Sequence, residues 1–377
     1  MGPPGARQNL RSRHLPGALA LLVLVCLPHA AASQSTTEAS GAELYRSACA
    51  ACHGADGKGA PRSLVGFETA LPDFTDCSFA TTEADLDWMA VVHQGGRARG
   101  FDRMMPAFGD ALSETEIARV VSHLRTFCAD PRWPRGDLNL PRPLVTEKAF
   151  PENEAVMTTS ISTGEQKAVV HELLYERRVG RRGQWEAVIP LTTQETADSG
   201  WRRSLGDIAL AFKHVVFESL PRGSILSAGG ELVLPTARES DGIGRGTAIF
   251  EPFGTFSQLL PRDGFLHLHG GFELPARTER ASKEAFWRAA LGKTYAEGRW
   301  GRTWSPIVEV LGARELVAGE GALWDVLPQL QVSLSTRQHV LLNAGVRVPL
   351  NRRDERSTAL TFYLLWDWFD GGLATGW

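Results

Sequence analysis

The sequence predicts two domains of different class: an all-α domain, then an all-β antiparallel domain that we expect to be a transmembrane barrel of about 12 strands. Apolar residues recur at helical spacing between residues 41 and 128, and at a spacing of two from about residue 154 onward. Residues 129–153 between them contain prolines throughout, which a single helix does not accommodate. A chain of 377 residues is long enough for both cores.

The N-terminus predicts export. Three arginines precede an apolar run over residues 15–27, which is shorter than the roughly 20 residues of a spanning helix. The small residues of His29-Ala-Ala-Ala-Ser33 then resemble a cleavage site. We therefore expect a signal peptide over residues 1–32, with a short uncleaved anchor as the alternative. The net charge of -3 and pI near 6.4 give no reason to expect nucleic acid as a partner.

One short motif in the α domain predicts a prosthetic group. Cys49-Ala-Ala-Cys-His53 has the C-x-x-C-H spacing at which two thiols add to the vinyl groups of a haem and the imidazole ligates the iron. Gly54, Gly57 and Gly59 follow at once and allow the backbone to pass closely. We expect one covalent haem c on Cys49 and Cys52, with His53 as an axial ligand.

The remaining cysteines suggest a disulfide. Cys26 lies within the predicted signal peptide, so an exported mature chain keeps Cys77 and Cys128 beside the haem cysteines. A bond between them closes a loop of about 50 residues and contributes on the order of 3 to 4 kcal/mol in the chain-entropy model. Two free buried thiols are the alternative.

Three helices are predicted around this motif. The first runs from Gly41 to Cys49, and the second starts at a sequence typical of a capping box, Thr82-Glu-Ala-Asp85, and ends before Gly95. Its expected apolar face comprises Leu86, Met89, Ala90 and His93. The third starts at Ser113-Glu-Thr-Glu116, a second capping box, and its expected face comprises Ile117, Val120, Val121, Leu124 and Phe127.

Residues 41–130 resemble class I cytochromes c. The resemblance rests on Cys49-Ala-Ala-Cys-His-Gly-Ala-Asp-Gly-Lys-Gly59, on Met104-Met-Pro-Ala-Phe108 and on the helix that follows Leu112. It implies that Met105, directly before a proline, is the second axial ligand of the haem iron. Such a thioether favours Fe(II) and occupies the position that oxygen needs, so the resemblance implies electron transfer. Met104 and His93 are the competing ligands.

The β domain is predicted from long alternating segments. About twelve of them begin near residues 155, 166, 183, 205, 222, 245, 263, 284, 302, 321, 338 and 356, with turn residues between them. Most run about 9 to 16 residues, which meets the 9 to 11 that a tilted strand needs to cross a bilayer. Such segments, of which Leu205-Gly-Asp-Ile-Ala-Leu-Ala-Phe-Lys213 is an example, resemble those of outer-membrane β-barrels. A soluble β-sandwich is the alternative.

The predicted organisation is a signal peptide (1–32), a cytochrome c domain (33–128), a proline-rich linker (129–153) and a β-barrel domain (154–377). In the linker, Trp133 and residues 138–140 can also pack back onto the cytochrome domain. In the barrel, His267 and His269 share a strand face, where we expect polar filling of the lumen rather than a metal site.

These predictions favour an electron-transfer protein, not an enzyme, because no catalytic constellation stands out. We expect it in the outer membrane with its cytochrome domain in the periplasm, in contact with outer-membrane lipid and with periplasmic redox partner proteins. Two alternatives remain: a pore for which the haem domain is a plug, sensor or docking module, and a soluble periplasmic cytochrome.

Overall fold

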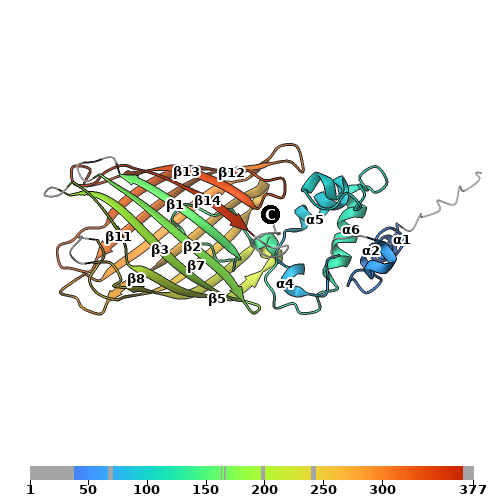
Figure 1. Ribbon diagram of the computed structural model, residues 1–377, viewed down its shortest axis with the longest axis horizontal. Helices are drawn as coiled ribbons and strands as arrows, with labels where there is room; N and C mark the ends of the chain where they lie inside the picture. The colour runs from blue at the N-terminus through green and yellow to red at the C-terminus, as the bar shows by residue number, and fades with distance from the viewer. Residues whose placement is uncertain are drawn as a thin grey trace, which may run out of the picture. The chain divides into compact units, whose positions relative to one another are not determined.

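We describe residues 38–66, 71–162, 164, 167–196, 200–238 and 243–367 of a computed structural model. The predicted signal peptide lies outside these residues. No described helix is both long and apolar enough to cross a membrane. The helices are α1 (Gly41–Ala48), α2 (Ala50–His53), α3 (Arg62–Val65), α4 (Cys77–Ala80), α5 (Asp85–Gln94), α6 (Glu114–Arg125) and the 3-10 turns η1 (Gly96–Arg99), η2 (Gly136–Leu138), η3 (Leu220–Arg222) and η5 (Pro261–Asp263) (Figure 1).

The N-terminal helices share one apolar core. Its buried members are Leu44, Tyr45, Cys49, Phe74, Ala80, Trp88, Met89, Val92, Ile117, Val120, Val121 and Leu124. The capping box predicted for α6 is confirmed: the Ser113 hydroxyl accepts from the Glu116 amide at 3.3 Å, and the Glu116 carboxylate accepts from the Ser113 amide at 2.8 Å. Ser40 and Glu43 form a second capping box at α1. Both helices therefore begin where side chains satisfy their first amides.

The start of α5 differs from the prediction. Its N-cap is Ala84, which offers no side-chain cap, and the hydroxyl of Thr82 donates instead to the Phe79 carbonyl at 2.9 Å. The Asp85 amide finds its acceptor far along the chain, in the Asp137 carboxylate at 3.0 Å. The predicted apolar face was also partly wrong, because Leu86 is 55% exposed while Trp88 and Val92 are buried.

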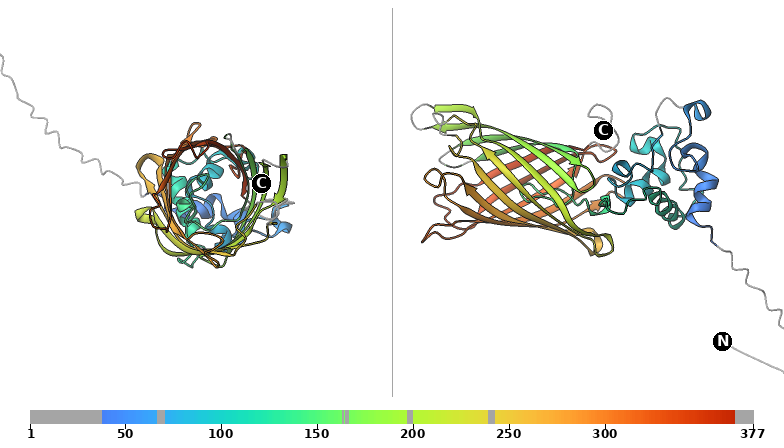
Figure 2. Two further views of the ribbon diagram at one scale, coloured as in Figure 1. Left: turned by 90° about the vertical axis from the view of Figure 1, so that its left-hand side faces the viewer. Right: turned by 90° about the horizontal axis from the view of Figure 1, so that it is seen from below.

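The β domain is a closed antiparallel barrel, with the ring seen end-on in Figure 2 (left). Around the ring, the hydrogen-bonded strands follow the order β1-β2-β3-β5-β6-β7-β8-β9-β11-β12-β13-β14. The last strand, β14, pairs with β1 and closes the ring. The strands are β1 (Glu154–Ser162), β2 (Ala168–Val179), β3 (Gly183–Thr196), β4 (Gly200–Leu205), β5 (Ile208–Ser219), β6 (Ser224–Leu234), β7 (Ile249–Leu260), β8 (Gly264–Pro275), β9 (Glu284–Lys293), β10 (Tyr295–Ala296), β11 (Thr303–Glu315), β12 (Leu323–Ser333), β13 (Val340–Pro349) and β14 (Ala359–Asp367).

The predicted barrel of about 12 strands is confirmed. Short β4 pairs only with β3 and precedes β5, while β10 pairs only with β11 and follows β9, so the ring has twelve positions among the described residues. Each ring strand begins within a few residues of its predicted start. Because a closed ring leaves no sheet edge, the β-sandwich alternative is wrong.

Side chains of the barrel are arranged inside out relative to a water-soluble protein. Along β5, Leu210 and Phe212 are 47% and 51% exposed on the outer face. Lys213, the next residue, is only 1% exposed and lies in the interior. Glu309 of β11 and His267 of β8 are also fully buried in the interior. An apolar outer face with a polar interior is the arrangement that a bilayer requires of a barrel.

The proline-rich stretch over residues 129–153 has two parts. Arg135 and Asp137 pair with α5, and the Gly136 amide donates to the Thr81 carbonyl at 2.7 Å. From Leu138 onward the chain is buried against barrel strands, where Leu138, Ala149 and Phe150 pack with Val215 and Ile225. We call residues 138–152 the lumen segment. Leu138 and Leu140 thus pack in the barrel, and not on the haem domain as the sequence allowed.

Candidate functional site

The C-x-x-C-H motif forms a tight turn held by Tyr45. The backbone amide of His53 donates to the Cys49 carbonyl at 2.9 Å, and the Tyr45 hydroxyl donates to the Gly54 carbonyl at 2.6 Å. Burial raises the pKa of Tyr45 to about 12, so its hydroxyl stays a donor. Gly57 has φ of +77°, and a Cβ there would lie 2.8 Å from the Phe127 ring. This position of the turn requires glycine, because no larger residue fits so close to the core.

The thiols and the imidazole have the chemistry that haem attachment needs. Cys49 and Cys52 are both free, and Cys49 is buried. Burial, followed by the neighbouring Cys52, raises the pKa of the Cys49 thiol to about 11. Burial also lowers the pKa of His53, which keeps the imidazole neutral and able to bind a metal. Its Nδ1 is buried without a hydrogen-bond partner among the described residues, although buried polar atoms are normally satisfied.

The structure separates the two candidate methionines. Met105 is half-buried and packs against the core cluster that contains Cys49, whereas Met104 is 54% exposed. The Met105 carbonyl accepts from the Gly96 amide at 3.0 Å, which fixes the loop beside the end of α5. Of the two side chains, only that of Met105 packs against the core that contains Cys49. The residues present therefore fit a covalently held haem with a thioether ligand.

His93 lies near this loop on α5. Its Nδ1 is also buried without a partner among the described residues, and a Cβ on Gly109 would lie 2.7 Å from its ring. Because this ring nitrogen is unpaired within the described part of the chain, His93 remains a competing ligand. A Met105 variant can distinguish between the two residues.

The second cysteine pair forms a disulfide in the structure. Cys77 at the start of α4 and Cys128 after α6 have Cα atoms 5.1 Å apart and bonded sulfurs. The bond joins two elements of the haem domain across a sequence separation of 51 residues.

Removing that bond should destabilise the haem domain alone. We expect Cys77→Ala with Cys128→Ala to lower its free energy of unfolding by about 3 to 4 kcal/mol, because the unfolded chain regains the entropy of an open loop. Denaturant titration followed by haem absorbance measures the loss. The boiling-dependent gel shift of the barrel is the control and should not change; an unaltered denaturation midpoint would contradict the prediction.

The lumen segment is hydrogen-bonded or ion-paired to every strand of the ring. Its partners, in ring order from β1 to β14, are Glu154, Glu176, Gln184, Lys213, Ser227, Ser257, His267, Arg288, Glu309, Gln329, Asn343 and Tyr363. Nε2 of His267 donates to the Pro141 carbonyl at 3.1 Å, so this imidazole helps to hold the lumen segment.

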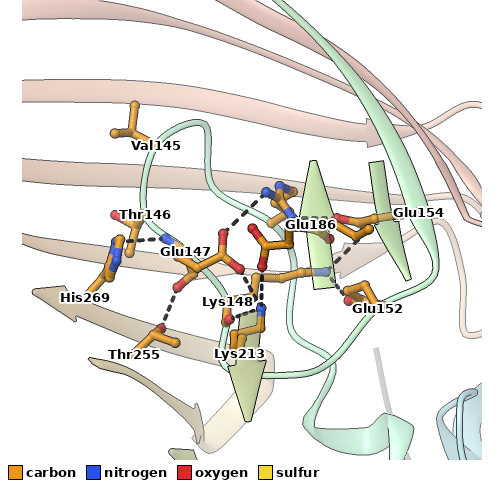
Figure 3. A network of polar contacts seen from close by, with 12 residues as sticks. Val145, Thr146, Glu147, Lys148, Glu152, Glu154, Glu186, Lys213, Thr255 and His269 are labelled. Atoms are coloured by element: carbon orange, nitrogen blue, oxygen red, sulfur yellow. Dashed lines mark hydrogen bonds and ion pairs between the residues drawn. The ribbon is translucent and has the colours of Figure 1, made fainter. Parts of the chain in front are cut away.

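Charged groups hold the middle of the lumen segment (Figure 3). Lys213 of β5 donates to the Glu147 carboxylate at 2.5 Å and to the Lys148 carbonyl at 2.8 Å. Arg142 donates to Glu154 at 2.6 Å and to Glu176 at 3.0 Å. Removal of one partner of such a buried pair costs roughly 3 to 5 kcal/mol, because the other charge is left unpaired. Nothing in the local sequence of residues 138–152 predicts this role.

Together, the fold and the site define a protein with a helical C-x-x-C-H domain joined to a barrel of twelve strands. Residues 36–124 match the family model described as cytochrome C oxidase, cbb3-type, subunit III. The chain is 31% identical over 124 residues to the chloroplastic cytochrome c6 of Chlamydomonas reinhardtii, a match that covers 32% of this chain and 74% of the relative. Through its N-terminal domain, the chain belongs to the cytochrome c family.

The barrel is similar to solved outer-membrane structures at low identity. An outer membrane channel from Pseudomonas putida F1 is 14% identical, with a TM-score of 0.45, covering 60% of this chain and 99% of the channel. The KdgM porin is 11% identical, with a TM-score of 0.37, covering 57% of this chain and 98% of the porin.

Proposed function

We propose that this protein is a one-electron carrier held at the outer membrane by its barrel. The observation that carries the proposal is the packing of half-buried Met105 against the core of a cytochrome c domain that contains buried Cys49, beside the neutral imidazole of His53. In this assignment Cys49 and Cys52 bind one haem c covalently, and His53 and Met105 ligate its iron. When bound, the haem supplies a one-electron couple.

The residues of the haem domain have separate roles in this proposal. The Tyr45 hydroxyl holds the turn that presents His53, through the Gly54 carbonyl. The hydrogen bond from the Gly96 amide holds the loop that presents Met105. The apolar core around Cys49 excludes water from the face of the site. A thioether ligand would raise the reduction potential and exclude exogenous ligands, which favours electron transfer over oxygen chemistry.

The outer membrane location rests on the barrel itself. Its exterior is apolar, its interior is charged, and its ring is closed, which together suit a bilayer. One haem cannot by itself carry electrons across a hydrocarbon core about 30 Å thick. We therefore infer that electrons are exchanged with periplasmic redox proteins on one side only. The lumen segment argues against a permanently open pore, because it contacts all strands of the ring.

Replacement of the proposed axial ligand tests this proposal most directly. We expect Met105→Ala to abolish the spectral signature of a thioether–iron bond and to lower the reduction potential by on the order of a hundred millivolts, a fraction of the roughly 0.8 V that axial ligands span. Spectroscopy and redox titration of the purified full chain measure both.

Met104→Ala is the matched control, since the exposed neighbour should leave spectrum and potential unchanged. A Met105 variant with the wild-type spectrum would refute the assignment, and loss of the thioether signature in Met104→Ala would move the ligand there. If His93→Ala alone changed the ligand signature, the bis-histidine alternative would be correct.

A further inference from the structure

Two carboxylates face each other across the seam at which the barrel closes. Glu154 is the first residue of β1, Asp367 is the last residue of β14, and the two are register partners in the pairing that joins the first strand to the last. Their side chains are buried, with 0% and 8% of Glu154 and Asp367 exposed. Like charges directly opposite on neighbouring strands destabilise a sheet, and burial increases that cost.

A third carboxylate belongs to the same group. Glu152, at the end of the lumen segment, is 1% exposed, and one carboxylate oxygen of each of the three residues lies within 4.8 Å of the others. We call Glu152, Glu154 and Asp367 the seam carboxylates. They come from the lumen segment, from β1 and from β14, which pairs with β1, so a ligand bound by all three would link these elements.

The cations nearby do not balance this charge. Lys148 binds one oxygen of Glu152, and its Nζ lies 3.8 Å from Glu154 Oε2. Arg142 binds the other oxygen of Glu154, but shares its guanidinium with Glu176 and Glu147. Asp367 forms no ion pair with any described residue. The three seam carboxylates therefore share one whole cation, Lys148, and part of the Arg142 guanidinium.

Two buried oxygens in the group lack a donor. Glu154 Oε2 and Asp367 Oδ1 have no hydrogen-bond partner within the described parts of the chain, and neither is accessible to water. Buried polar atoms in folded proteins nearly always have a partner, so two such oxygens at one place point to a ligand that bonds carboxylates without donating a hydrogen. A hard divalent cation binds oxygen ligands in this way.

We propose that the seam carboxylates bind one divalent cation of the calcium class, which links the first and last strands of the barrel. Such a cation supplies positive charge that Lys148 and the shared Arg142 do not. Glu154 Oε2 and Asp367 Oδ1 supply direct ligands, and Glu152 supplies a third oxygen. The cation converts an opposed pair of like charges into a bridge across the closing strand pair. The site is independent of the haem and of electron transfer.

The test is calorimetric titration of the full chain in detergent with calcium chloride, after treatment with a chelator. We expect one calcium ion per chain and at least about a tenfold weaker affinity in Asp367→Asn and in Glu152→Gln, which each remove one ligand charge. Glu186→Gln is the matched control, because this buried carboxylate of β3 lies in a separate group with Glu147 and Glu176.

Thermal stability gives a second readout that a purely structural role would not produce. Without calcium, Asp367→Asn should unfold at a higher temperature than the wild type, because the like-charge pair is gone; with calcium the order should reverse. The boiling-dependent gel shift, scanned over temperature, measures both. No calcium binding by wild type, or equal loss in Glu186→Gln, would overturn the proposal. If the stability of the wild type does not depend on calcium but rises as the pH falls, the carboxylates share a proton instead of binding a cation. That result would also overturn the proposal.

Discussion

A chain carrying Cys49→Ser and Cys52→Ser is expected to retain no haem after denaturation, while its barrel assembles unchanged. The two thiols are the proposed covalent attachment, and no other cysteine within the described residues is free. The core around Cys49 shares no residue with the apolar clusters of the barrel, so the effect should stay in the haem domain. Haem staining of a denaturing gel measures the attachment.

The disulfide pair provides the matched comparison. Cys77→Ala with Cys128→Ala removes the same number of sulfurs from the same domain, yet should keep full haem staining. The boiling-dependent gel shift reports barrel assembly in both variants. Haem staining that persists without Cys49 and Cys52 would show that the group is attached elsewhere.

Replacing residues 140–150 with a glycine–serine stretch of equal length is expected to turn a closed barrel into a conducting one. The replacement removes Arg142, Glu147 and Lys148, which occupy the interior, and leaves wall residues such as Glu176 and Glu309 facing an empty lumen. Charged walls without a filling segment admit water, as in wider barrels. Single-channel recording in planar bilayers measures the current.

The wild type should show no steady current in the same recording. The control replaces residues 277–282, in the β8–β9 turn, with a glycine–serine stretch of the same length as that turn. This barrel should also remain closed, because the turn lies outside the lumen segment. If the wild type and the 140–150 variant both conduct equally, the segment does not close the barrel. That outcome would favour the pore alternative.

The strands were predictable because each carries its own alternating pattern. Period two assigns residues such as Leu210 and Lys213 to opposite faces, and turn residues mark the ends, so strand starts could be read locally. The capping box at Ser113 was equally local, with both of its hydrogen bonds formed within four residues. The C-x-x-C-H motif is also local, whereas the prediction for Met105 depended on the resemblance to class I cytochromes c.

The lumen segment was not predictable because its partners are distant. Prolines excluded a helix over residues 129–153, but nothing local shows that Thr146 meets Glu309, 163 residues away. A signal was present in the inward positions of the strands, where Lys213, Glu176 and Glu309 place charges that require partners inside. The start of α5 was predicted wrongly for the same reason, because the acceptor of the Asp85 amide is Asp137, 52 residues away.

The division of residues 129–153 between two cores leaves little unattached chain between the haem domain and the barrel. A free spacer from Cys128 to Leu138 would reach roughly 35 Å at full extension and let the domain sweep a large volume. Arg135, Gly136 and Asp137 are instead bonded to the haem domain, and Leu138 is already buried in the barrel. The unattached connection between the two cores is therefore short. In the proposed function, we expect electron exchange to scale with the concentration of soluble partners that diffuse to the membrane.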